Sequence, residues 1–104
     1  MSLNMNQLLK QAQKLQQDMQ KVQEDLASET VEGTASTSGV KVVANGLGEI
    51  LQVRIPRESV DPEDMEMLED LVLMAIRDAV KKSQELSSER MGKLTGGMKL
   101  PGLF

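Results

Sequence analysis

Apolar residues near the start of the chain recur with the spacing of a helix that packs along one partner. The steps between them alternate between three and four residues over three heptad repeats, at Met5, Leu8, Ala12, Leu15, Met19, Val22 and Leu26. Gln and Lys, which are good helix formers, fill most of the positions between them. The pattern predicts a helix over residues 4–27, about 36 Å long. Its narrow apolar stripe is typical of a helix that lies on one partner helix.

The middle of the chain, residues 30–55, is predicted to form a three-stranded antiparallel meander. Apolar and polar side chains alternate there, so the sheet would have one covered face and one wetter face. The third strand has its apolar side chains on one predicted face, at Leu51, Val53 and Ile55. Between the second and third strands, Asn45-Gly46 predicts a tight hairpin turn in which both residues have positive φ.

A second helix is predicted over residues 62–91, with a wider apolar stripe than the first. Asp61 is a good N-cap, Pro62 suits the first helical position, and acids follow in the first turn, where the helix dipole favours them. The helix would be about 42 Å long. Gly92 is expected to end it and to leave residues 92–104 as an irregular tail.

These elements predict a single α+β domain over residues 1–104. A compact chain of this size has a diameter of about 34 Å, which both predicted helices exceed. Something must cover the apolar ends of the helices, and a symmetric homodimer is the commonest solution. A monomer whose helices fold back or fray is the alternative. The dimer interface is expected to use apolar side chains of both helices and the third strand, namely Leu8, Leu15, Met19, Val22, Leu51, Val53, Leu71 and Met74.

Several residue types are missing from the chain, and their absence excludes classes of function. Without Cys or His there is no thiolate nucleophile, no zinc–cysteine site and no imidazole base. Phe104 is the single aromatic residue. Single-stranded nucleic acid is usually held by stacking its bases on aromatic rings, so this mode of binding is nearly excluded. The acids of residues 58–70 crowd a helix start and match no calcium loop. We therefore expect no catalysis, no cofactor, no metal and no small-molecule substrate.

Charge is segregated along the chain although the net charge is only −4. Residues 58–70 carry seven acids and no base, whereas residues 1–23 have a net charge of +2 and residues 77–99 a net charge of +3. Basic helix faces can bind a polyanion despite an acidic average, because phosphate contacts and counterion release act locally. The candidate DNA-binding residues are the bases of both helical segments: Lys10, Lys14, Lys21, Arg77, Lys81, Lys82, Arg90 and Lys93.

Three stretches of the sequence, taken in order, resemble the YbaB/EbfC family. They are a Gln/Lys/Met-rich opening helix at residues 9–20, the run from Met67 through Val72 to Lys82, and the closing Met91–Phe104 stretch with its Leu-Thr-Gly-Gly-Met and Leu-Pro-Gly. Val40-Lys41-Val42 and Asn45-Gly46 also fit, so the likeness covers nearly the whole chain.

The resemblance implies a function as well as a fold. It implies a long N-terminal helix, a three-stranded antiparallel sheet and helical C-terminal segments in a tweezer-like homodimer. It also implies a bacterial nucleoid-associated protein that binds double-stranded DNA with low sequence specificity and influences DNA conformation and gene expression. No membrane span or secretion signal is visible, so we expect a cytoplasmic protein. The alternative is an acidic protein–protein adaptor with incidental DNA affinity.

Overall fold

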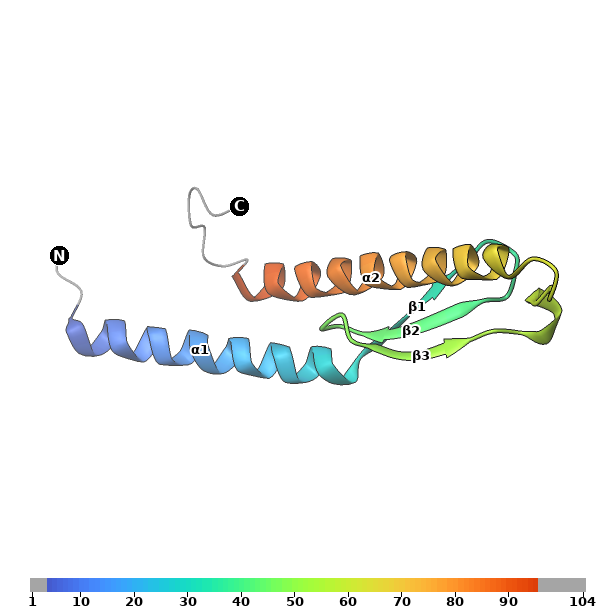
Figure 1. Cartoon of the computed structure of the whole chain (residues 1–104). Helices are drawn as coiled ribbons and strands as arrows, with labels where there is room; N and C mark the ends of the chain where they lie inside the picture. The colour runs from blue at the N-terminus through green and yellow to red at the C-terminus, as the bar shows by residue number, and fades with distance from the viewer. Residues whose placement is uncertain (1–3, 96–104) are drawn as a thin grey trace.

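The chain folds into an elongated body from which its first helix projects (Figure 1). The computed structural model describes residues 4–95. The principal extents are 73 × 25 × 16 Å, and the radius of gyration is 19.9 Å, against about 13 Å for a compact chain of this length. The elements in chain order are α1 (Met5–Ser28), β1 (Thr30–Thr34), β2 (Lys41–Asn45), β3 (Ile50–Arg54), the 3-10 turn η1 (Arg57–Ser59) and α2 (Met65–Thr95).

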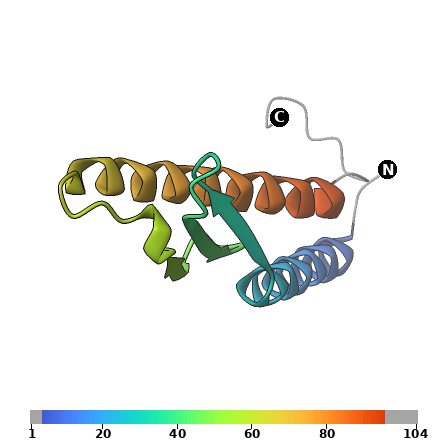
Figure 2. The same cartoon turned by 90° about the vertical axis from the view of Figure 1, so that its right-hand side faces the viewer.

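The predicted α+β fold is confirmed: two long helices accompany an antiparallel sheet with strand order β1-β2-β3. Helix α2 crosses one face of the sheet over β1 and β2 (Figures 1 and 2). Val42 and Ala44 of β2 point to this face and are fully buried. Helix α1 lies beyond the end of the sheet at which β1 begins, and Glu29 joins it to β1.

Small side chains let α2 approach the sheet closely. Ala75 and Ala79 of α2 are fully buried against the sheet. A Cβ built on Gly33 of β1 would lie 2.1 Å from the backbone oxygen of Ala75. No real Cβ tolerates that distance, so the β1–α2 packing requires glycine at position 33.

Two side chains of α2 form hydrogen bonds with backbone groups of β1. The carboxylate of Asp78 accepts a hydrogen bond of 2.9 Å from the backbone N–H of Thr34. The ammonium of Lys82 donates a hydrogen bond of 2.9 Å to the backbone oxygen of Glu32 and lies 3.1 Å from Asp78. An unpaired strand edge invites another strand, and these contacts block that pairing along β1.

The prediction that Asn45 and Gly46 form a tight turn with positive φ is wrong. The residue with positive φ in this connection is Gly48, at 85°, and Asn45 is the last residue of β2. The Asn45 side chain accepts hydrogen bonds of 3.0 Å from the backbone N–H groups of Leu47 and Glu49. Residues 46–48 form a three-residue loop that the Asn45 N–H closes on the Glu49 oxygen at 3.0 Å, and such loops place the positive φ at their last residue, here Gly48.

Helix α2 is shifted toward the C-terminus relative to the prediction over residues 62–91. Asp64, rather than Asp61, caps it by accepting a 3.1 Å hydrogen bond from the N–H of Met67. Asp61 instead caps the preceding turn through the N–H of Glu63. Gly92 lies inside the helix, since a single exposed glycine costs only about 1 kcal/mol relative to alanine. Of the expected irregular tail, residues 96–104 lie outside the described residues.

Strand β3 does not have the covered face that its sequence pattern predicts. All five of its residues are exposed, because α2 covers β1 and β2 and stops short of β3. A register shift between Val43 and Ala44 leaves Leu51 without a partner on β2, because Ala44 pairs with Ile50. Leu51, Val53 and Ile55 are all exposed, so none of the three is covered within the chain.

Candidate nucleic-acid interface

Three lysines form an exposed stripe along α1. Lys10, Lys14 and Lys21 lie on the flank of the helix turned away from Leu26, the one buried side chain of α1. Within residues 4–94, none of the three has an ion-pair partner. Their ammonium groups are therefore available to an anion along most of the length of the helix.

Helix α2 adds two bases on the side opposite the sheet. Arg77 and Lys81, four residues apart, project away from the side that buries Ala75 and Ala79. Neither side chain takes part in an ion pair within the described part of the chain. The intervening Asp78 carboxylate is engaged by Lys82 and Thr34, so it neutralises this pair of bases only in part.

Lys82 and Lys93, also predicted to bind DNA, are already paired with acids. Lys82 bridges Asp78 and the backbone of β1, as described above. The N–H of Thr34 is the main cause that lowers the pKa of Asp78 below its ordinary value, with the Lys82 hydrogen bond second. Lys93 lies 3.3 Å from Glu89 on an exposed surface, where such pairs contribute little and exchange readily.

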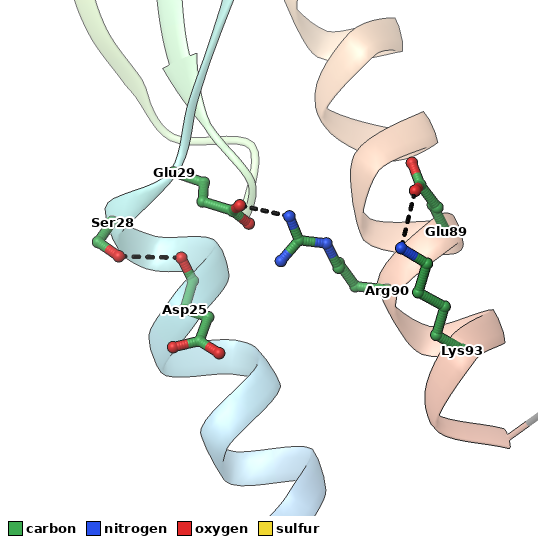
Figure 3. A network of polar contacts seen from close by, with 6 residues as sticks. All are labelled: Asp25, Ser28, Glu29, Glu89, Arg90 and Lys93. Atoms are coloured by element: carbon green, nitrogen blue, oxygen red, sulfur yellow. Dashed lines mark hydrogen bonds and ion pairs between the residues drawn. The ribbon is translucent and has the colours of Figure 1, made fainter.

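Arg90 reaches across from α2 to the base of α1, where it pairs with Glu29 (Figure 3). The side chains of Arg90 and Glu29 are 33% and 35% exposed, so two thirds of each is removed from water. The second carboxylate oxygen of Glu29, Oε2, is buried and has no hydrogen-bond partner among residues 4–94. Arg90 therefore differs from the lysines of α1, because its positive charge is already paired with an acid of the same chain.

Further along α1, an open gap separates it from the end of α2. The gap has a volume of about 310 Å³ and is lined by Gln11, Lys14, Leu15, Asp18 and Leu94. One base and one acid face it, so the gap itself is not a strongly basic cleft. The basic surface is the outward flank of α1.

The residues predicted for the dimer interface fall into two groups. Five are exposed large apolar side chains, namely Leu8, Met19, Leu51, Val53 and Met74. Three are half-buried within the chain: Leu15 and Val22 on α1, and Leu71 against the core. Sequence reasoning missed an apolar groove of about 380 Å³ between β3 and α2, lined mainly by Ile55, Leu68, Val72, Leu73 and Ile76.

Sequence reasoning also missed a pair of bases on the sheet. Lys41 of β2 lies directly opposite Arg54 of β3, on the face away from α2. The two side chains line a shallow hollow of about 340 Å³ with Gly39, Ile55 and Pro56. The residues are thirteen positions apart, and only the strand register brings them together, so no local sequence signal could have revealed the pair.

Two further features of the described residues concern metal ions and membranes. No group of three or more acids within residues 4–95 is placed to hold a metal ion. Neither α1 nor α2 contains a stretch long and apolar enough to cross a membrane.

Comparison with known proteins gives one consistent result. The model of the YbaB/EbfC DNA-binding family matches residues 1–98. A nucleoid-associated protein of Pelotomaculum thermopropionicum is 54% identical over 101 residues, which cover 97% of this chain and 96% of the relative. One from Chloroflexus aurantiacus is 52% identical over 102 residues, covering 98% and 100%. A crystal structure of an uncharacterized Helicobacter pylori protein matches with a TM-score of 0.76 at 19% identity, covering 94% of this chain and all of that one.

Proposed function

The chain belongs to the YbaB/EbfC DNA-binding family, and from that premise we propose that it binds double-stranded DNA as a homodimer with low sequence specificity. The observation that carries the proposal is the stripe of unpaired lysines on α1: Lys10, Lys14 and Lys21. Lysines that bind phosphates release condensed counterions, and this release is the sequence-independent part of DNA affinity.

The residue types on this surface support contacts to the DNA backbone. Lysine binds phosphate as a point charge, and the Gln side chains between the lysines can donate to phosphates as well as pair with base edges. The aromatic rings that hold single strands are absent, since the one aromatic residue is Phe104. A duplex bound through its phosphates, on α1 and secondarily on Arg77 and Lys81, fits this chemistry. Such binding would change DNA conformation, and through it gene expression, at the nucleoid.

The second copy is the occupant that we propose for the apolar surface of β3 and α2. Among residues 4–94, seven hydrophobic side chains are buried, four of them alanines, and fourteen large ones are exposed. A monomer rarely exposes so much apolar surface. Asp78 and Lys82 block the edge of β1, whereas no described side chain is bonded to the backbone along the outer edge of β3. Together with the apolar groove beside it, the outer edge of β3 is therefore the surface at which we expect two copies of the chain to make a symmetric contact.

Charge reversal on α1 tests the proposed DNA surface. We expect the double variant Lys14→Glu/Lys21→Glu to weaken binding to random-sequence duplex by at least about tenfold, because each chain of the dimer would lose two phosphate contacts and gain two repulsions. Mobility shift at roughly 50 mM salt measures the affinity.

The matched control is the single variant Arg57→Glu, compared with Lys21→Glu, which changes the net charge equally; Arg57 lies in η1, at the end of the sheet remote from α1. The control should retain most of the affinity. An equal loss in both variants would mean that net charge, rather than the α1 surface, governs binding.

A further inference from the structure

Helix α1 is long and is attached to the sheet at one end, so a small change in its direction at that end displaces its lysines by several ångströms. Its 24 residues span about 36 Å. Lys10 lies roughly 28 Å along the axis from the C-terminal end, so a tilt of about 10° there would displace it by about 5 Å. Phosphates follow one DNA strand at about 3.4 Å of axis each. The angle of α1 therefore decides whether its lysines meet the phosphates.

The base of α1 is fixed to the β2–β3 connection. Leu26 is buried against Gly46, whose backbone N–H donates to the oxygens of Leu26 at 2.8 Å and Glu29 at 3.1 Å. The Asn45 amide donates a hydrogen bond of 3.2 Å to the oxygen of Ala27. These contacts hold the end of α1 against the sheet, and beyond them the main contacts of α1 are with α2.

The Arg90–Glu29 ion pair is placed to set the direction of α1 relative to α2. Glu29 is the residue that follows α1, and Arg90 projects toward it from the facing side of α2 (Figure 3). Further toward the end of α2, the two helices enclose the open gap beside Leu15 and Leu94, where packing is loose. Because Glu29 Oε2 is buried without a hydrogen-bond partner among the described residues, losing Arg90 would leave a poorly solvated charge.

We propose that Arg90 is a positioning residue for DNA binding: its ion pair with Glu29 fixes the angle between α1 and α2, and it does not contact the duplex. The inference rests on the proposed DNA binding by α1. To bind a phosphate, the Arg90 guanidinium would have to leave Glu29, and the Glu29 carboxylate would then have no partner. Lys10, Lys14 and Lys21 bind phosphate without such a loss.

The variant Glu29→Gln separates the two roles of Arg90 by the sign of its effect. If Arg90 positions α1, removing its partner lowers the affinity for random-sequence duplex by about tenfold, a usual coupling for residues in contact. If Arg90 contacts DNA and Glu29 competes for it, the same variant raises the affinity and steepens the salt dependence by about 0.9 per Arg90. A rise would overturn the proposal.

Exchanging the two charges gives a second test. Arg90→Glu and Glu29→Arg should each weaken binding, and the double exchange should restore both affinity and salt dependence, since the pair is remade with reversed polarity. An arginine that contacts phosphate cannot be rescued by a glutamate at position 90. Exchange of the exposed neighbours Arg57 and Glu58 in η1 is the control and should leave binding unchanged. Failure of the rescue, with the double variant folded, would overturn the proposal.

The direction of α1 relative to α2 can be measured without DNA, which separates this inference from the proposed function. The chain has no cysteine, so spin labels can be attached at cysteines introduced for Gln7 and Ser88, both exposed. Labelled chains diluted into excess unlabelled protein report the distance within one chain. The distance distribution should broaden in Arg90→Glu and narrow again in the double exchange. An unchanged distribution in Arg90→Glu would overturn the positioning role, whereas absence of DNA binding by the wild type would overturn only the proposed function.

Discussion

At the scale of single residues, two glycines in different surroundings make opposite predictions. Gly33→Ala should destabilise the fold by about 2–3 kcal/mol, because its Cβ would lie 2.1 Å from the Ala75 oxygen and force α2 off the sheet. Gly92→Ala should stabilise it by up to about 1 kcal/mol, since position 92 is helical with open space around its Cβ. Urea unfolding of the two variants measures both changes. Equal effects would mean that α2 does not pack on β1 as described.

A second residue-scale prediction concerns Asp78 and acid. The Thr34 N–H and the Lys82 ammonium lower the pKa of Asp78 in the folded chain, so its contribution to stability is present above the ordinary aspartate pKa of about 3.9. The contribution is lost as the pH falls through the lowered pKa. We expect Asp78→Asn to have a lower melting temperature than wild type at pH 7, and the difference to shrink below about pH 4. A difference independent of pH would rule out the ionised Asp78 contact.

At the scale of elements, the edge of β3 and the adjoining groove carry the proposed dimer contact. Leu73 lines the groove and is 44% exposed, so Leu73→Glu should spare the core and place a charge where the second copy packs. We expect the wild type to have twice the chain mass of 11.4 kDa in solution and the variant to be a folded monomer. Light scattering gives the mass, and circular dichroism controls for folding. A variant that remains dimeric would move the interface away from this groove.

The elements also show where sequence pattern succeeds. The heptad spacing from Met5 to Leu26 predicts the first helix to within a residue at either end, because a long periodic signal averages out local exceptions. Boundaries that depend on one cap are less secure: Asp61 and Asp64 are both good caps, and the helix begins after the second. The bulge at Leu51 and the opposition of Lys41 and Arg54 depend on strand register, which no local pattern specifies.

The candidate site was predictable in its residue types but only partly in their pairing. Charge counts along the chain pointed to both basic helical segments, and the exposed stripe of Lys10, Lys14 and Lys21 lies where the helical spacing places it. Lys82 and Lys93 have acidic partners four residues away, a spacing that the sequence shows. The Glu32 backbone oxygen bound by Lys82 and the Glu29 partner of Arg90 are 50 and 61 residues away along the chain. Such long-range contacts arise only when α2 docks on the sheet, so the sequence could not show that Arg90 is paired within the fold.

At the scale of the whole molecule, an acidic chain presents a stripe of lysines on its projecting helix α1. Seven acids lie between residues 58 and 70, at the start of α2, and the lysine stripe lies on α1 at the other end of the molecule. A dimer doubles the stripe, so a duplex would meet six lysines that act together, although the net charge of each chain is −4.

The salt dependence of duplex affinity is the most direct test of DNA binding through these lysines. If all six engage phosphates, the logarithm of the affinity should fall against the logarithm of the salt concentration with a slope of about −5 or steeper. In Lys14→Gln/Lys21→Gln the slope should be shallower by between three and four, at about 0.9 for each lost contact. A wild-type slope near zero, or no binding at roughly 50 mM salt, would contradict the proposed function.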